Sequence, residues 1–119
     1  MRIVIDLDGT ICQLKKPDQS YAEVLPLPGA QQAIRSLKKQ GHEIVIYTAR
    51  NMKTQGGNVG RVMQHVGKTT IDWLVEYDIP YDELVFGKPY GDLYIDDLAC
   101  TFHTWQEVMR KLAPEEKEE

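Results

Sequence analysis

Two carboxylates, Asp6 and Asp8, stand two residues apart at the end of an apolar, β-branched run. Burying unpaired carboxylates is costly, so we expect a cation to neutralise them, and their hard oxygens suit Mg²⁺. Gly9 follows directly and permits a tight turn whose backbone amides can hold phosphate oxygens. A carboxylate in such a place can attack phosphorus as a nucleophile, and a second can carry protons to and from the leaving oxygen.

Further polar residues follow other apolar runs along the chain. Thr48 can donate a hydrogen bond to a phosphate oxygen. Lys88, between Gly87 and Pro89, can stabilise charge that develops on a phosphoryl group in the transition state. Asp96 and Asp97 can complete a metal shell whose remaining positions are taken by water.

Short apolar runs alternate with helical patterns along the chain. We expect strands at 2–7, 43–48, 83–86 and 93–95. We expect helices at about 29–39, from the glycine-rich loop 55–58 to about 77, and at about 104–112; Gly60 and Gly67 weaken the second, which can form as two pieces. The alternation predicts an α/β fold, a three-layer Rossmann-like sandwich with a mainly parallel sheet covered on both faces. Functional residues of such sheets lie beyond the carboxyl ends of the strands, where the polar residues above fall.

The chain has 119 residues, which is enough for one domain with one core and too few for two. We expect this domain to span 1–113 and the charged tail 114–119 to be disordered. Residues 11–28 contain three prolines and predict an irregular flap.

The composition limits which binding partners and which cellular compartment we expect for this protein. The net charge of −4 argues mildly against a nucleic-acid partner, because phosphate backbones are held by clustered Lys and Arg. Cys12 and Cys100 form no Cys-x-x-Cys pair, so neither a zinc site nor a disulfide framework is expected. The sequence shows no signal-peptide core and no run of membrane-spanning length, which favours a cytoplasmic protein without a membrane partner.

The order of these motifs resembles that of the haloacid dehalogenase (HAD) superfamily. Asp-Leu-Asp-Gly-Thr at 6–10 resembles its signature, and three further motifs follow in the same order at 44–48, 87–89 and 93–97. The resemblance covers essentially the whole chain except the tail. It implies an HAD-like domain that hydrolyses phosphomonoesters with Mg²⁺ through an aspartyl-phosphate intermediate.

The resemblance also implies a role for each matching residue. Asp6 is expected to be the nucleophile and a metal ligand. Asp8 is expected to be the general acid/base, with its backbone carbonyl on Mg²⁺. Thr48 and Lys88 are expected to bind the phosphate, so the catalytic group is Asp6, Asp8, Thr48 and Lys88.

Two further sets follow from the same resemblance. Asp96 matches the usual metal-ligating carboxylate, and Asp97 assists directly or through water. The expected metal-site residues are therefore Asp6, Asp8, Asp96 and Asp97. The residues expected around the substrate are Leu7, Gly9, Thr10, Thr48, Ala49, Arg50 and Lys88.

Some of these positions have rival interpretations. Arg50 is as well explained by a polar surface loop as by substrate contact. Lys68 also follows a glycine, but it lies inside an expected helix, which favours Lys88. Gly91-Asp92 fits a variant metal motif only if it ends a strand, whereas here it precedes one.

The gaps between motifs are too short for the cap domain that many family members carry. The resemblance therefore implies a capless member, which either accepts large substrates or closes its site by forming homo-oligomers. We expect a small phosphorylated metabolite, such as a sugar or sugar-acid phosphate. A phosphotransferase and a non-catalytic phosphate-sensing or scaffold module are the alternatives. Neither the substrate, the pathway nor the oligomeric state follows from the sequence.

Overall fold

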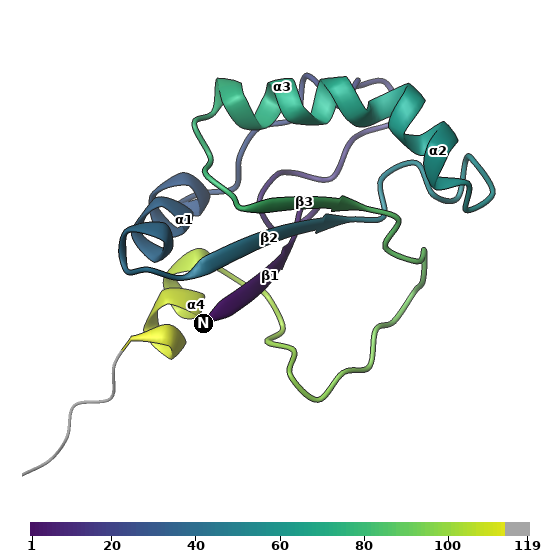
Figure 1. Cartoon of the computed structure of the whole chain (residues 1–119). Helices are drawn as coiled ribbons and strands as arrows, with labels where there is room; N and C mark the ends of the chain where they lie inside the picture. Colours follow the sequence, from purple (N-terminus) through teal and green to yellow (C-terminus); the bar gives the residue numbers. More distant parts are fainter. Residues whose placement is uncertain (114–119) are drawn as a thin grey trace, which may run out of the picture.

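The computed structural model describes residues 1–113, so the expected disordered tail lies outside the described residues. Three strands and the helices between and after them make up the chain (Figure 1). In chain order they are β1 (Arg2–Asp6), α1 (Ala30–Lys39), β2 (Glu43–Thr48), α2 (Val59–Val62), the π-helical stretch η1 (Met63–Gly67), α3 (Lys68–Glu76), β3 (Glu83–Phe86) and α4 (Trp105–Leu112).

The three strands form one open parallel sheet in the order β1-β2-β3. Asp6 pairs with Tyr47, and Thr48 pairs with Phe86, so all three strands end at the same edge. The fold class is therefore confirmed as α/β with a parallel sheet. The carboxyl-end edge holds Asp6 and Asp8, Thr48 at the end of the motif 44–48, and the motif 87–89, as the sequence predicted.

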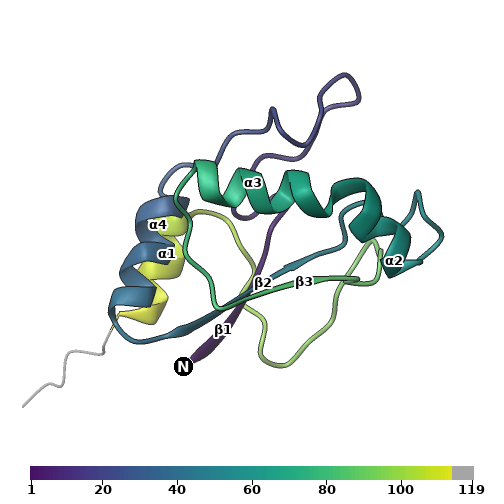
Figure 2. The ribbon, with the colours of Figure 1, turned by 45° about the horizontal axis from the view of Figure 1, so that its top comes forward.

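One face of the sheet packs into a single apolar core. Ile5, Ile44 and Ile46 point into it and meet buried residues of α1, α3 and α4, namely Ala30, Ala33, Ile34, Leu37, Trp73, Leu74 and Trp105. Helix α4 lies beside α1 at the end of the molecule that also holds the N-terminus (Figure 2). On the opposite face of the sheet, Val4 and Val85 remain exposed. Within residues 1–113, no helix combines the length and apolar character needed to cross a bilayer.

The expected helices form close to their predicted bounds. The first ends as expected before Gly41, whose φ of 92° is a left-handed conformation that favours glycine. The second forms in pieces, as its glycines indicated: Asn58 caps α2 by accepting from the Arg61 amide, and the π-helical turn η1 then joins α2 to α3.

The flap at 11–28 has no helix or regular strand, as expected. Its two ends are tied together, because the Gln13 amide donates to the Leu25 carbonyl and the Leu27 amide donates to the Ile11 carbonyl. Its returning segment is held by α3, where the Trp73 indole donates to the Val24 carbonyl at 2.8 Å. The flap is therefore an anchored cover beside the strand ends.

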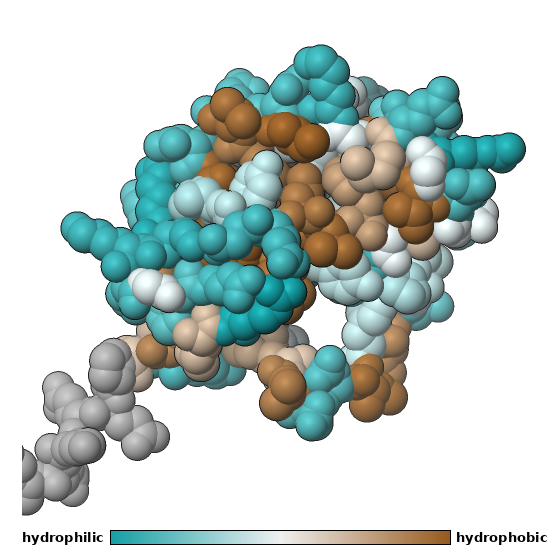
Figure 3. All heavy atoms as spheres, viewed as in Figure 1, coloured by the Kyte–Doolittle hydropathy of each residue, from teal (hydrophilic) through white to brown (hydrophobic). Residues whose placement is uncertain are grey.

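The expected strand at 93–95 is wrong. Residues 87–104 form a projecting loop that leaves the sheet, and its apolar side chains stand away from the body of the molecule (Figures 1 and 3). Leu93 is 77% exposed and Ile95 is 91% exposed. Local bonds explain the turning path: the Tyr94 hydroxyl donates to the Pro89 carbonyl at 2.6 Å, and the Asp96 carboxylate accepts from the Leu98 amide at 2.8 Å. The outer edge of β1 consequently has no strand partner among the described residues.

Candidate active site

A tight turn after β1 brings Asp6 and Asp8 to the edge of the sheet. The Leu7 amide donates to the Tyr47 carbonyl and extends the β1–β2 ladder by one residue. The chain then turns at Gly9, whose φ is 83°, and the Leu7 carbonyl accepts from the Ile11 and Cys12 amides at 2.9 and 3.1 Å. This fixes the turn backbone and separates the directions taken by the two carboxylates.

The turn amides expected to hold phosphate are bonded within the protein. The Gly9 amide donates to the Cys12 carbonyl at 2.8 Å, and the Thr10 amide donates to the Leu7 carbonyl at 3.3 Å. The Ala49 residue is half-buried beside them, and its carbonyl accepts from Met52. The structure thus places Leu7, Gly9, Thr10 and Ala49 around the site as backbone that shapes it.

Asp6 faces Lys88, which lies in the motif that follows β3. The Lys88 ammonium lies 3.4 Å from Asp6 Oδ1, and the Lys88 amide donates to the Thr48 carbonyl at 3.1 Å, which fixes the lysine backbone to the end of β2. Burial raises the pKa of the Asp6 carboxyl above its ordinary value, and the Asp8 charge adds to the rise. The Lys88 charge and a hydrogen bond from Leu7 oppose it without cancelling it. A further cation near Asp6 would therefore favour its ionised, nucleophilic form.

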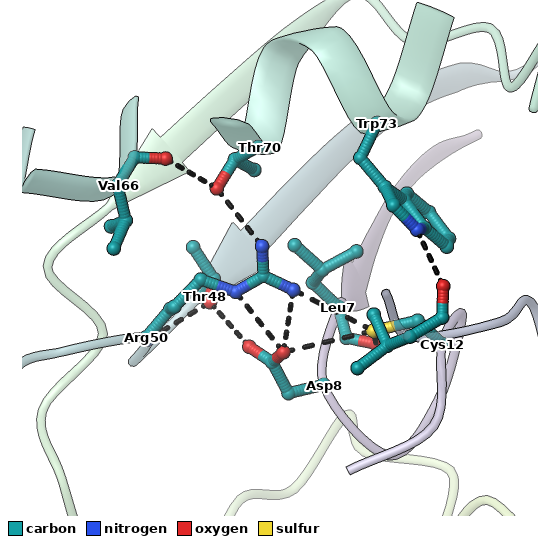
Figure 4. A network of polar contacts seen from close by, with 9 residues as sticks. Leu7, Asp8, Cys12, Thr48, Arg50, Val66, Thr70 and Trp73 are labelled. Atoms are coloured by element: carbon teal, nitrogen blue, oxygen red, sulfur yellow. Dashed lines mark hydrogen bonds and ion pairs between the residues drawn. The ribbon is translucent and has the colours of Figure 1, made fainter. Parts of the chain in front are cut away.

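The Asp8 carboxylate points toward Thr48 and Arg50 and forms a polar network with them (Figure 4). Its Oδ2 accepts the Thr48 hydroxyl proton at 2.8 Å. Its Oδ1 accepts from Nη2 and Nε of Arg50 at 2.7 and 3.2 Å. The Arg50 amide in turn donates to the Thr48 hydroxyl at 2.9 Å, so the end of β2 and the residues after it hold both oxygens of the carboxylate. Thr48 was expected to bind phosphate, and the structure shows its buried hydroxyl bonded to Asp8 instead.

The Arg50 side chain is completely buried, with 0% of its surface exposed. Its remaining Nη1 donates to the Thr70 hydroxyl at 3.0 Å, and Thr70 donates to the Val66 carbonyl in η1 at 2.7 Å. The Tyr21 ring of the flap lies over the guanidinium at 4.0 Å from its centre. Arg50 was expected near the substrate, and the structure shows its donors committed to the protein interior instead.

Cys12 lies beside this network as a buried thiol. Its Sγ is 3.6 Å from both the Leu7 carbonyl and Asp8 Oδ1, to which it can donate. Burial raises the pKa of Cys12 to about 12, with the Asp8 charge as the next cause. Because the thiolate is the reactive form, Cys12 is a packing residue and not a nucleophile.

The two lysines considered for the site, Lys68 and Lys88, lie in different parts of the structure. Lys68 is exposed on α3 and pairs with Asp72 four residues along the helix. Lys88 lies at the strand-end edge against Asp6, and the Tyr94 ring covers its ammonium at 4.1 Å. Lys88 is therefore the lysine that belongs to the site.

The expected metal ligands come together only in part. Asp6 is partly exposed and can offer a carboxylate oxygen. Both carboxylate oxygens of Asp8 are occupied, which leaves its backbone carbonyl, the atom expected on Mg²⁺, as the ligand it can offer. Asp96 and Asp97 are exposed on the projecting loop. Within residues 1–113, no group of three His, Cys, Asp or Glu side chains is arranged to hold a metal ion. The described arrangement therefore does not fit a complete Mg²⁺ site.

The sequence analysis did not assign Thr70, Tyr94 or Cys12 to the site. Thr70 comes from a segment far from the motifs, so no spacing marks it. Tyr21, on the flap, could be considered as a pocket residue from the sequence, but nothing in the spacing placed it over Arg50. For Arg50 a signal existed, because a carboxylate entering a core needs a cationic partner and Arg50 is the cation nearest to the end of β2.

A family model described as haloacid dehalogenase-like hydrolase matches residues 3–70, which is more than half of the chain and contains the Asp-x-Asp turn, Thr48 and Arg50. A comparison with curated proteins returns no match.

Solved structures share the fold. A crystal structure of a target protein from Vibrio cholerae is 35% identical with a TM-score of 0.77, over 95% of this chain and 100% of that one. The D,D-heptose 1,7-bisphosphate phosphatase of B. bronchiseptica, complexed with magnesium and phosphate, is 21% identical with a TM-score of 0.52, over 94% and 64% of the two chains. A chain of the Pnkp1/Rnl/Hen1 complex is 23% identical with a TM-score of 0.53, over 81% of this chain and 30% of that one.

Proposed function

Because the chain belongs to the haloacid dehalogenase-like hydrolases, we propose that it hydrolyses phosphomonoesters through an aspartyl-phosphate on Asp6. The observation that carries the proposal is the pairing of a partly exposed carboxylate with a lysine at the strand-end edge, beside a second carboxylate held in a fixed direction. We assign the reacting role to Asp6 and the proton-transfer role to Asp8.

The proposed chemistry runs in two steps on this chain's own residues. Asp6 attacks phosphorus, and as the bond to the leaving oxygen breaks, Asp8 gives that oxygen its proton. Water then attacks the phosphoryl group and passes a proton to Asp8, which releases phosphate and restores Asp6. Lys88 offsets negative charge on the phosphoryl oxygens throughout. Thr48 holds Asp8 in place through its hydroxyl.

We also propose Mg²⁺ as the cofactor, which when bound would offset repulsion between the Asp6 carboxylate and the phosphate dianion. Support comes from the burial of Asp6, which raises the pKa of its carboxyl, so a bound cation would favour the ionised form. The phosphatase from B. bronchiseptica was solved with magnesium and phosphate. Asp96 and Asp97 are the proposed further ligands.

For Asp96 to reach Asp6, the projecting loop has to move, and the free outer edge of β1 offers a place for it. Leu93 and Ile95 are two residues apart, so in an extended segment both would face the same side of the sheet. The five steps from Lys88 to Leu93 span at most about 18 Å when extended. This is just enough for the diagonal of about 17 Å that leads from the end of β3 across β2 and β1 and back to the level of Ile3. Docking there would also cover Val4, which is 57% exposed.

Hydrogen exchange tests this movement apart from activity. With Mg²⁺ added, amide exchange in 93–97 and at the outer edge of β1 is expected to slow. Asp96→Asn should abolish that protection, and Asp92→Asn, a neighbouring change outside the proposed ligand set, should leave it intact. Unchanged exchange in protein that binds Mg²⁺ would reject the movement.

The substrate is proposed to be a small phosphorylated metabolite, with sugar and sugar-acid phosphates as the first candidates. Phosphate release from sugar phosphates, sugar-acid phosphates, nucleotides and phosphopeptides, with Mg²⁺ and with EDTA, tests the reaction and ranks these classes. Mg²⁺-dependent release supports the proposal. No release across the panel, from folded protein that binds Mg²⁺, would favour a non-catalytic phosphate-sensing module.

A further inference from the structure

We propose that Arg50 is a positioning residue that decides which oxygen of Asp8 carries the catalytic proton. The inference rests on the proposed function, in which Asp8 is the general acid and base. It assigns Arg50 to the carboxylate and not to the substrate.

The hydrogen bonds to Asp8 are asymmetric. Oδ1 accepts from two nitrogens of Arg50, at 2.7 and 3.2 Å, whereas Oδ2 accepts only from the Thr48 hydroxyl at 2.8 Å. A guanidinium has donors and no acceptor, and it stays charged. A proton on Oδ1 would therefore face two N–H groups with nothing to accept it, while a proton on Oδ2 faces a hydroxyl oxygen with lone pairs.

Arg50 consequently reserves Oδ2 as the atom that takes up and gives away the proton. Loss of the leaving group takes the proton from Oδ2, and attack of water returns one to the same oxygen. The carboxylate needs no rotation between the two steps, because Oδ1 stays bonded to Arg50 in both.

Two further contacts hold the guanidinium besides those with Asp8. Thr70 on α3 accepts from Nη1, and the Tyr21 ring of the flap covers the guanidinium plane at 4.0 Å. The Arg50 amide bonds the Thr48 hydroxyl, so the same residue also orients the second partner of Asp8. With no exposed surface on its side chain, Arg50 cannot reach a substrate without breaking these contacts.

The test uses leaving groups that differ in their need for a proton. p-Nitrophenolate leaves readily without protonation, whereas the alkoxide of an alkyl phosphate such as glycerol phosphate does not. For Arg50→Met, kcat on the alkyl phosphate is expected to fall about 100-fold, as for a disabled general acid. On p-nitrophenyl phosphate, kcat should change far less, and KM for both substrates should stay near wild type.

Two further variants separate positioning from a loss of folding. Arg50→Lys keeps the charge but cannot bond Oδ1 twice, so it should recover only part of the loss. Thr70→Val removes the Nη1 partner in nearly the same shape and should give a smaller loss with the same leaving-group selectivity; Thr70→Ser keeps the hydroxyl and should behave as wild type. If Arg50→Met does not fold, the Thr70 pair decides the question.

The outcomes distinguish a failure of the positioning role of Arg50 from a failure of the proposed hydrolase function. Equal losses on both substrates in the Arg50 and Thr70 variants would overturn the positioning role while leaving the hydrolase intact. In an Asp8→Asn background, Arg50→Met should cause no further loss on the alkyl phosphate, and an additional tenfold loss would also overturn it. Wild-type protein that hydrolyses neither substrate would reject the proposed function itself.

Discussion

The ammonium of Lys88 lies 3.4 Å from the carboxylate of Asp6, across the edge where β1 and β3 end. Lys88→Met is expected to lower kcat by about 100-fold, the scale found when one group that stabilises transition-state charge is removed. Lys68→Met is the matched control, because Lys68 is exposed and pairs with Asp72 on α3. Steady-state phosphate release measures both, and equal activity of the two variants would exclude Lys88 from the site.

Asp82 provides a pH-dependent contribution to stability that is separate from the site. Its Oδ2 accepts from the Lys38 ammonium and from the Ile44 amide, both at 2.7 Å, which ties α1 to the start of β2. These bonds hold the pKa of Asp82 below its ordinary value, with Lys38 as the largest cause. A depressed carboxyl pKa stabilises the folded state above the unfolded pKa, and this stabilisation is lost as the pH falls through the folded value.

Asp82→Asn should therefore unfold at lower denaturant concentration than wild type above about pH 4, the ordinary carboxyl pKa. The difference should shrink as the pH falls below that value, because Asp82 becomes protonated in the wild type. Urea unfolding followed by circular dichroism at several pH values gives both curves. A difference that stayed constant down to strongly acidic pH would show that the ionised carboxylate is not responsible.

The two cysteines should differ sharply in reactivity. Cys12 is buried with a pKa raised to about 12, whereas Cys100 is exposed on the projecting loop. Iodoacetamide at neutral pH is expected to alkylate Cys100 in the native protein and to reach Cys12 only after unfolding. Peptide mapping by mass spectrometry reads out each site, and rapid labelling of native Cys12 would contradict its burial beside Asp8.

The sequence predicted the structure best where a reactive polar residue directly follows a strand. Asp6 and Asp8 follow a β-branched run, and Thr48 and Lys88 each follow another, so a parallel sheet brings all of these positions to one edge. The glycines at 41, 60 and 67 correctly indicated where one helix ends and where the other changes geometry.

The sequence predicted the structure poorly where a contact with a residue far along the chain determines the local conformation. The run at 93–95 is apolar and short enough for a strand, but a strand forms only beside a partner, and local bonds of Tyr94 and Asp96 turn this segment instead. The direction of Asp8 likewise depends on Arg50 and on Thr70, sixty-two positions further along the chain, and no local pattern reports that contact.

The most direct test of the account concerns Asp6 itself. Protein quenched in acid during turnover of its best substrate is digested, and its peptides are mapped by mass spectrometry. The account predicts a phosphoryl group on the peptide that contains Asp6, and neither that group nor phosphate release in folded Asp6→Asn. Phosphate release by folded Asp6→Asn at a rate near that of the wild type would contradict it.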